Sequence, residues 1–273
     1  MTVDSVVYES LRKLRPPSPI FIQAEDEKIQ HLVLEVLGYG GSKRAYALEG
    51  GMALLLPNTL VLNNSSRSVL WSRMVEEELT ATRRVRELGL FACNLEKVQV
   101  FMTTESSTSI PAYRTETFSQ LSKKGIWIID NKNPTSSTWD KSLFKDGVDR
   151  FDEKNWEPIL SPFLVDIAKL ITNNFLLHDD NVNIAIVEDE GKSYKIRYFG
   201  FDFSSRYEEL SFKSIGPEHL RSMISFVISS SLWSIFYVEF RGADLDRQDA
   251  LKRSLRASCI KKLSAALSLP EAS

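Results

Sequence analysis

The chain is poor in the residues that build metal centres and covalent cross-links. It has two cysteines and three histidines in 273 residues. Cys93 and Cys259 lie far apart, with no Cys-x-x-Cys pair and no Cys/His spacing around them. Zinc sites and disulfide frameworks both need such spacing. We therefore expect neither a zinc site nor a disulfide, and we expect a reducing compartment.

An excess of one charge and a signal peptide are also missing. The 34 lysines and arginines nearly balance the 36 aspartates and glutamates, which leaves a net charge of −2. This balance argues against nucleic acid as a partner, because phosphates call for a basic stripe. Residues 1–19 are polar and lack a signal-peptide core. Serines dilute the most apolar segment, Met223 to Phe240, so we expect a buried helix instead of a transmembrane segment.

Hydrophobic residues are plentiful, at 43% of the chain, and their periodicity changes along it. Short apolar runs with glycine punctuation predict antiparallel strands over residues 20–62, 98–102 and 110–118, with one long amphipathic helix over 67–90. The later chain predicts a strand over 126–129, a joint or insertion within 122–157, and helices over 162–177, 219–240 and 246–267. A hairpin is expected over 184–187 and 194–203. The class is α+β, with a β-rich part over 1–120 and a more helical part over 121–273.

A glycine-rich turn separates two of the expected strands. It contains Gly38, Gly40, Gly41, Ser42 and Lys43. Glycine lets backbone N–H groups approach phosphate oxygens closely, and the lysine adds positive charge. The alternative is a tight hairpin with no ligand. The turn is not a Walker A loop, because no helix follows it and the Gly-Lys-Ser/Thr ending is absent.

Three consecutive glutamates, Glu76, Glu77 and Glu78, lie in the first long helix. At helical spacing, Glu78 shares a face with Val75 and Val85 and is expected to point inward. A carboxylate on an apolar stripe needs a cationic partner, and Lys43 is the natural candidate. The alternative for each of these glutamates is a solvated position.

Two acidic segments follow. His178-Asp179-Asp180-Asn181-Val182-Asn183 combines a possible general base with oxygen ligands for a hard cation such as Mg²⁺, or else is an Asn/Asp-rich turn. Asp202 interrupts the apolar segment Tyr198 to Phe203, where burial would disfavour it unless it binds a metal or caps an element.

Taken in order, these four features resemble those of a divergent protein kinase. The resemblance implies a two-lobed kinase-like fold, with an N-lobe over 1–120, a truncated and mainly helical C-lobe over 121–273, and ATP with Mg²⁺ or Mn²⁺ as cofactors. It implies that the glycine-rich turn covers the nucleotide phosphates. It also assigns three roles, namely the catalytic base to Asp180 and the metal ligands to Asn183 and Asp202.

The sequence departs from the usual kinase pattern in the placement of its lysine. The segment that matches the third strand, Met52 to Pro57, has no lysine. Lys43 lies instead where the with-no-lysine kinases place theirs, within Gly-x-Gly-x-x-Lys. We therefore expect Lys43 to neutralise phosphate charge, with Glu78 positioning it and Glu77 in reserve.

The catalytic loop and the C-terminal part are shorter than in most kinases. Only two residues separate Asp180 from Asn183, so Asp179 or Asn181 is an alternative holder of one role. The chain after Asp202 is too short for the full set of helices that dock peptide substrates. This compact form is similar to the effector kinases that bacterial pathogens inject into host cells, which would place the protein in the host cytosol without a cleaved signal peptide.

The expected function is therefore ATP-dependent phosphotransfer, by an atypical Ser/Thr kinase acting on a host protein. Alternatives are a lipid or small-molecule kinase, similar to choline, aminoglycoside or phosphoinositide kinases, a nucleotide-binding pseudokinase scaffold, and a nucleotidyl transferase. The last helix carries five basic residues beside an apolar stripe. These form a solvated face or bind an anionic ligand such as an inositol phosphate or a lipid headgroup. They are Lys252, Arg253, Arg256, Lys261 and Lys262.

Overall fold

The chain folds into two compact units of mixed α+β structure. The computed structural model describes residues 11, 13–24, 27–39, 43–58, 65–131, 134–175, 177, 182–189, 193–200, 216–240 and 244–269. One unit comprises Met1–Thr82 and Cys93–Gln120, and the other comprises Arg83–Ala92 and Leu121–Ser273. The mixture of sheets and helices agrees with the α+β class expected from the sequence.

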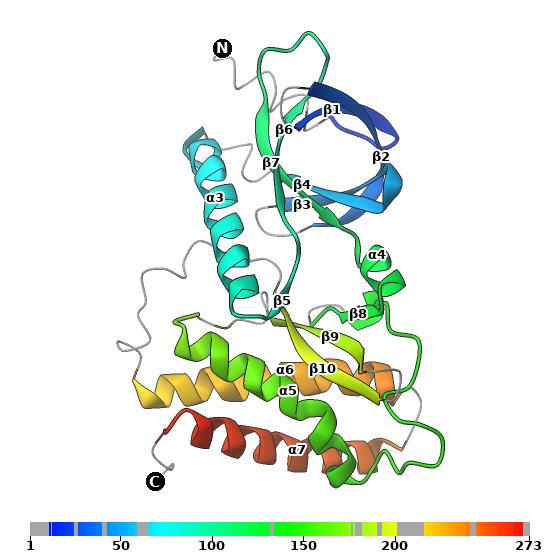
Figure 1. The fold of residues 1–273 in the computed structure, drawn as a ribbon, viewed down its shortest axis with the longest axis vertical. Coiled ribbons are helices and arrows are strands. Elements are labelled where there is room, and N and C mark those ends of the chain that lie inside the picture. Colours follow the sequence, from blue (N-terminus) through cyan, green and yellow to red (C-terminus); the bar gives the residue numbers. More distant parts are fainter. Residues whose placement is uncertain are drawn as a thin grey trace. The chain divides into compact units, whose positions relative to one another are not determined.

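The first unit is built on a closed barrel of antiparallel strands in the order β1-β2-β3-β4-β7-β6 (Figure 1). The strands are β1 (Ser18–Ala24), β2 (Glu27–Tyr39), β3 (Lys43–Leu48), β4 (Met52–Pro57), β6 (Glu96–Phe101) and β7 (Ile110–Glu116). Closure through the β1–β6 pair removes the free edges that an open sheet would leave. The short 3-10 helix η1 (Glu49–Gly51) joins β3 to β4, with Gly50 and Gly51 at φ +82° and +79°, a conformation that favours glycine.

Alternating apolar residues fill the barrel. Side chains spaced two residues apart on β1, β3, β6 and β7 are buried because they point to the same face of the sheet. Examples are Ile20, Ile22, Tyr46, Leu48, Val98, Val100, Ile110 and Ala112. Strands occupy most of the described parts of the expected ranges 20–62, 98–102 and 110–118, and residues 59–62 lie outside the described residues. The strand expected over 110–118 ends at Glu116, and a short helix, α4 (Phe118–Lys123), follows it.

The long helix predicted over 67–90 is α3 (Ser65–Glu87). Val75, Thr82 and Val85 form its buried stripe, together with Glu78. Gly89, at φ +72°, lies beyond the end of the helix, and its N–H donates to the carbonyl of Arg86. A glycine in this left-handed conformation commonly follows the end of a helix.

The second unit contains a four-stranded sheet in the order β5-β10-β9-β8. Its strands are β5 (Phe91–Ala92), β8 (Ile126–Ile129), β9 (Val182–Asp189) and β10 (Ser193–Gly200). The predicted hairpin is the antiparallel pair β9–β10, and β5 joins it in parallel. β10 ends at Gly200, so the predicted continuation to Phe203 lies outside the described residues.

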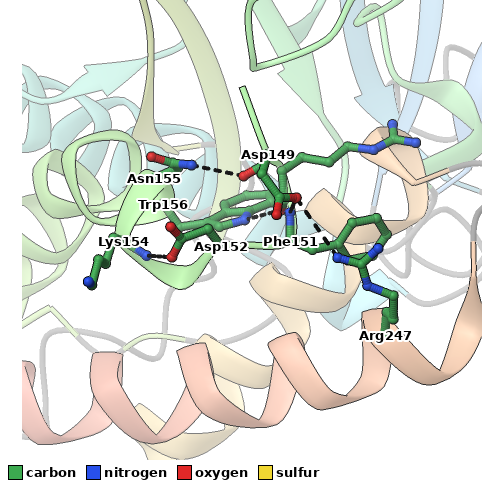
Figure 2. A network of polar contacts seen from close by, with 8 residues as sticks. Asp149, Phe151, Asp152, Lys154, Asn155, Trp156 and Arg247 are labelled. Atoms are coloured by element: carbon green, nitrogen blue, oxygen red, sulfur yellow. Dashed lines mark hydrogen bonds and ion pairs between the residues drawn. The ribbon is translucent and has the colours of Figure 1, made fainter. Parts of the chain in front are cut away.

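The helix expected over 162–177 begins earlier, as α5 (Glu153–Thr172), and contains both Pro158 and Pro162. Asp152 fixes this earlier start, because its side chain accepts a hydrogen bond from the Lys154 backbone N–H. Figure 2 shows this N-terminal network. There, the Trp156 indole donates to the Arg150 carbonyl at 2.8 Å.

Two further helices complete this unit, α6 (Pro217–Glu239) and α7 (Leu245–Ala266). Within the described parts of the chain, α6 is the one helix long and apolar enough to cross a membrane by length and composition, and 56% of its apolar window is buried inside the protein. The predicted stripe of α7 is also buried. It consists of Leu255, Cys259 and Leu263, and Leu251 one turn earlier is buried as well.

The segment expected to be a joint or insertion, within 122–157, packs into the second unit instead. Trp139 is buried and meets the rings of Trp127 and Tyr194 at centroid distances of 5.3 and 4.8 Å. Glu239, at the end of α6, accepts hydrogen bonds from the Ser142 hydroxyl at 2.6 Å and the Leu143 N–H at 2.9 Å. These contacts hold an irregular polar segment against the helices.

Candidate functional site

A buried ion pair joins the start of β3 to the middle of α3. Lys43, the first residue of β3 after the glycine-rich turn, places its Nζ 2.5 Å from Glu78 Oε2. The two side chains are 7% and 5% exposed. The structure therefore brings together the lysine and the glutamate that the sequence proposed as partners.

The other two glutamates of the acidic run have different partners. Glu77 pairs with Arg73 one turn earlier on α3, and Glu76 pairs with Lys97 at the surface. Their pairing partners are 73% and 46% exposed, so these are surface interactions of small energetic value. Of the three carboxylates, Glu78 is the one that reaches Lys43.

Tyr113 on β7 completes the cluster. Its hydroxyl donates to Glu78 Oε2 at 2.6 Å, so the same carboxylate oxygen receives both the ammonium and the phenol. The strand register explains this placement, because Ala45 faces Leu55 on β4 and Leu55 faces Tyr113 on β7. Side chains two residues apart on a strand share a face, so Lys43 and Tyr113 lie on the same side of the sheet.

Trp71 supports Tyr113 from α3. The two rings stack with centroids 6.3 Å apart and planes at 23°, and the Trp71 indole donates to the Pro111 carbonyl at 2.7 Å. Trp71 is 1% exposed, as is Tyr113. The phenol is thus held by packing as well as by its hydrogen bond.

Cys93 lies in the electrostatic neighbourhood of this cluster. It is 3% exposed, and burial raises the pKa of its thiol to about 12, an effect that the hydrogen bond with Thr115 only partly offsets. Glu78 raises this pKa further and Lys43 lowers it. A thiol in this state carries almost no thiolate at neutral pH and is a poor nucleophile.

Most of the glycine-rich turn lies outside the described residues, namely Gly40, Gly41 and Ser42. Gly38 is described at the end of β2, opposite Ala45 and beside a register shift. A Cβ added at Gly38 would meet no atom within 4 Å, so space is open at this position. The phosphate-covering role of the turn remains a prediction.

The predicted catalytic loop and metal ligands are described only at Asn183. Asp179, Asp180, Asn181 and Asp202 lie outside the described residues. Asn183 on β9 is 4% exposed, and its Oδ1 accepts a hydrogen bond from the Asn131 N–H at 3.1 Å. An amide oxygen has two lone pairs, so it can accept this bond and still serve as an oxygen ligand of the kind that Mg²⁺ prefers.

Asn131 is itself part of a buried polar group at the end of β8. Its Nδ2 donates to Ser231 Oγ at 3.3 Å, and its carbonyl accepts from Ser234 Oγ at 3.2 Å. Its side-chain oxygen is buried, and none of the described residues donates a hydrogen bond to it. Ser231 and Ser234 of α6 thus hold Asn131 in place by hydrogen bonds, and Asn131 in turn binds Asn183. In the sequence, these serines only lower the hydrophobicity of an apolar segment.

Sequence reasoning missed Tyr113, Trp71 and Asn131. Tyr113 and Trp71 read as ordinary apolar residues of a strand and a helix, and Asn131 reads as a residue of a polar loop. Their contacts join positions far apart in the chain, and no local signal in the sequence marks them.

The predicted anion-binding face of α7 is largely engaged with the protein itself. Lys252 pairs with Asp249, and Lys262 pairs with Glu157 of α5. Arg256 donates to the hydroxyls of Ser225 and Ser229 on α6. These contacts account for three of the five basic residues by helix packing, and an anionic ligand at this face stays a prediction.

Comparisons with known proteins give weak likenesses. No protein-family model and no curated protein matches the chain. Among solved structures it is similar to aerobactin synthetase IucC from a hypervirulent pathotype of Klebsiella pneumoniae, at 14% identity and a TM-score of 0.37, over 89% of this chain and 48% of that one. It thus spans about half the length of the synthetase.

A second likeness is to the aminoglycoside phosphotransferase APH(2'')-Ib with ADP bound. The identity is 12% and the TM-score 0.25, over 97% of both chains. Both similarities are weak, and neither assigns a role to a residue. The site is therefore defined by contacts within this chain. The buried ion pair of Lys43 with Glu78 lies at its centre.

Proposed function

We propose that the chain is an ATP-dependent phosphotransferase. The observation that carries the proposal is the buried ion pair of Lys43 with Glu78, directly after a glycine-rich turn. A buried ion pair does little for stability compared with apolar residues of the same size, because both charges lose their hydration. A functional role for the lysine accounts for a buried charge at this position, since a phosphate group would share the ammonium with the carboxylate.

Each further part of the site takes a role in this proposal. Gly38, Gly40, Gly41 and Ser42 present backbone N–H groups to the phosphates, and Lys43 neutralises their charge. Asp180 orients the acceptor hydroxyl and accepts its proton. Asn183 and Asp202 supply oxygen ligands, and the Mg²⁺ or Mn²⁺ held there would offset charge on the transferred group. Most of the rate enhancement would come from positioning and electrostatics.

We propose a hydroxyl of a host protein as the acceptor, with the chain acting as an atypical Ser/Thr kinase in the manner of a bacterial effector. A lipid or a small metabolite is the alternative acceptor for the same chemistry, and the acceptor panel below distinguishes them.

The test is intact mass spectrometry after incubation with ATP, either divalent metal, and separate protein, lipid and metabolite acceptors. Added phosphate on an acceptor or on the chain supports the proposal, and added AMP identifies a nucleotidyl transferase. Lys43→Met and Asp202→Ala should abolish transfer. Glu76→Gln is the matched control, because Glu76 pairs with Lys97 at the surface and should leave transfer unchanged. No transfer with any acceptor, together with no ATP binding, refutes the proposal.

A second candidate is a nucleotide-binding protein that does not transfer phosphate. The observation that favours it is the engagement of Asn183 Oδ1 by the Asn131 N–H, because it leaves the amide oxygen fewer ways to meet a metal. This candidate predicts ATP binding by calorimetry with no turnover under Mg²⁺ or Mn²⁺. Detectable turnover that is lost in Asn183→Ala eliminates it.

A further inference from the structure

We infer that Tyr113 is a positioning residue that holds the Glu78 carboxylate while Lys43 engages the nucleotide. The inference rests on the proposed function. Its starting observation is that two groups donate to the same oxygen of Glu78. Lys43 Nζ and the Tyr113 hydroxyl lie 2.5 and 2.6 Å from Oε2. Two donors on one oxygen compete for the same lone pairs and orient the carboxylate jointly.

The need for a second donor follows from burial. Glu78 is 4% exposed, so its charge lacks the hydration that it would have at the surface. When the ammonium of Lys43 turns toward a phosphate, its hold on Glu78 weakens, and a buried carboxylate that loses its donor carries a large desolvation penalty. The phenol of Tyr113 remains in place as a charge-assisted donor and lowers the cost of this exchange.

The phenol is held where this role requires it. The Tyr113 ring stacks on Trp71, and the Trp71 indole is fixed by the Pro111 carbonyl at 2.7 Å. The ring also lies 5.4 Å from Lys43 Nζ, within the range of a cation–π attraction. Tyr113 therefore touches both partners of the ion pair, and its hydroxyl cannot move away without breaking the stack.

A matched control is available in the same barrel. Tyr46 on β3 is 2% exposed, and its hydroxyl accepts a hydrogen bond from Arg44 at 3.2 Å. Tyr46→Phe and Tyr113→Phe thus each remove one buried hydroxyl from the barrel, and only the second removes a donor to Glu78. Loss of a generic buried hydroxyl should affect both variants alike.

The experiment measures ATP affinity by calorimetry, with Mg²⁺, for the wild type, Tyr46→Phe, Tyr113→Phe, Glu78→Gln and the double variant Tyr113→Phe/Glu78→Gln. We expect Tyr113→Phe to bind ATP about tenfold more weakly, which corresponds to one charge-assisted hydrogen bond at the low end of its range. Tyr46→Phe should bind within about twofold of the wild type. In the Glu78→Gln background, Tyr113→Phe should add about threefold or less, because the charged acceptor is gone.

Thermal unfolding of the same variants separates positioning from structure. Tyr113→Phe should unfold at a lower temperature than Tyr46→Phe, because it removes a donor to a buried carboxylate. Both variants should nevertheless be folded at the temperature of the calorimetry, where only Tyr113→Phe loses ATP affinity. Equal affinity of Tyr113→Phe and Tyr46→Phe, or a full tenfold loss that persists in the Glu78→Gln background, overturns the inference while the proposed function stands. A wild-type chain that binds no ATP refutes the proposed function, and the inference falls with it.

Discussion

Removing the charge of Glu78 should destabilise the protein strongly. In Glu78→Gln, the ammonium of Lys43 stays in a site where its side chain is 7% exposed, but it loses its anionic partner at 2.5 Å. Breaking a buried pair by removing one partner costs about 3–5 kcal/mol. The glutamine oxygen still accepts a neutral hydrogen bond, so we expect the lower end, about 3 kcal/mol.

Denaturant unfolding followed by tryptophan fluorescence measures this loss, with Trp71 stacked on Tyr113 beside the pair. Glu76→Gln is the control on the same helix, and it should cost less than about 1 kcal/mol because Glu76 and its partner Lys97 are 57% and 46% exposed.

A double variant tests the cause of the loss. Lys43→Met/Glu78→Gln removes the ammonium that Glu78→Gln deprives of its carboxylate, and it keeps an acceptor for the Tyr113 hydroxyl. It should therefore recover part of the stability lost in Glu78→Gln, since an apolar side chain tolerates this buried site. A Glu78→Gln loss no larger than that of Glu76→Gln, or a double variant less stable than Glu78→Gln alone, refutes the reasoning.

Three further predictions concern other buried groups. Cys93 and Cys259 should resist iodoacetamide at pH 8 in the native protein, because burial raises the pKa of their thiols to about 12 and about 11. Both should be labelled in denaturant, and rapid labelling of the native protein, measured by mass spectrometry, contradicts this prediction. Burial also raises the pKa of Glu239, so its stabilising contribution is present at low pH and is lost as the pH rises through the folded-state pKa. The free energy of unfolding of the wild type minus that of Glu239→Gln, measured with urea, should therefore be more positive at pH 5 than at pH 7. A more positive value at pH 7 contradicts a raised pKa of Glu239. Arg197 Nε lies 2.7 Å from Oδ2 of Asp166, whose side chain is 2% exposed. Arg197→Met should cost about 3 kcal/mol in the same assay, because it removes this cation from a buried carboxylate and leaves it the Tyr198 N–H as a donor; a cost below about 1 kcal/mol shows that the pair contributes little.

Local pattern was sufficient for most of the secondary structure. The spacing of Val75, Glu78, Thr82 and Val85 predicted both the long helix and the inward direction of one carboxylate, and all four side chains are buried. The pattern failed at the start of α5, where Asp152 caps the helix and Pro158 lies inside its first turns. Pro158 is the sixth residue of α5, so it lies past the first turn and removes the hydrogen bond that an N–H there would donate to the Lys154 carbonyl. The cap at Asp152 and the burial of the helix outweigh this local cost.

Sequence patterns predicted only part of the candidate site. The sequence named Lys43 and Glu78 because a buried carboxylate calls for a cation, and charge complementarity holds whatever the fold. It had no means of naming Tyr113, since that residue reaches Glu78 only because β4 lies between β3 and β7 in the barrel. Strand order is set by long-range pairing, which leaves no mark on the local pattern.

The sequence by itself thus determined which residues had to be buried and which charge needed a partner, because periodicity and desolvation act on short segments. Tertiary structure alone decided which atoms meet. It set the distance between Lys43 and Glu78, brought Tyr113 to the same carboxylate with Trp71 stacked on its ring, and placed Asn131 against Asn183. Each of these contacts joins separate elements of the chain, and only the packing of those elements sets the distances between their side chains.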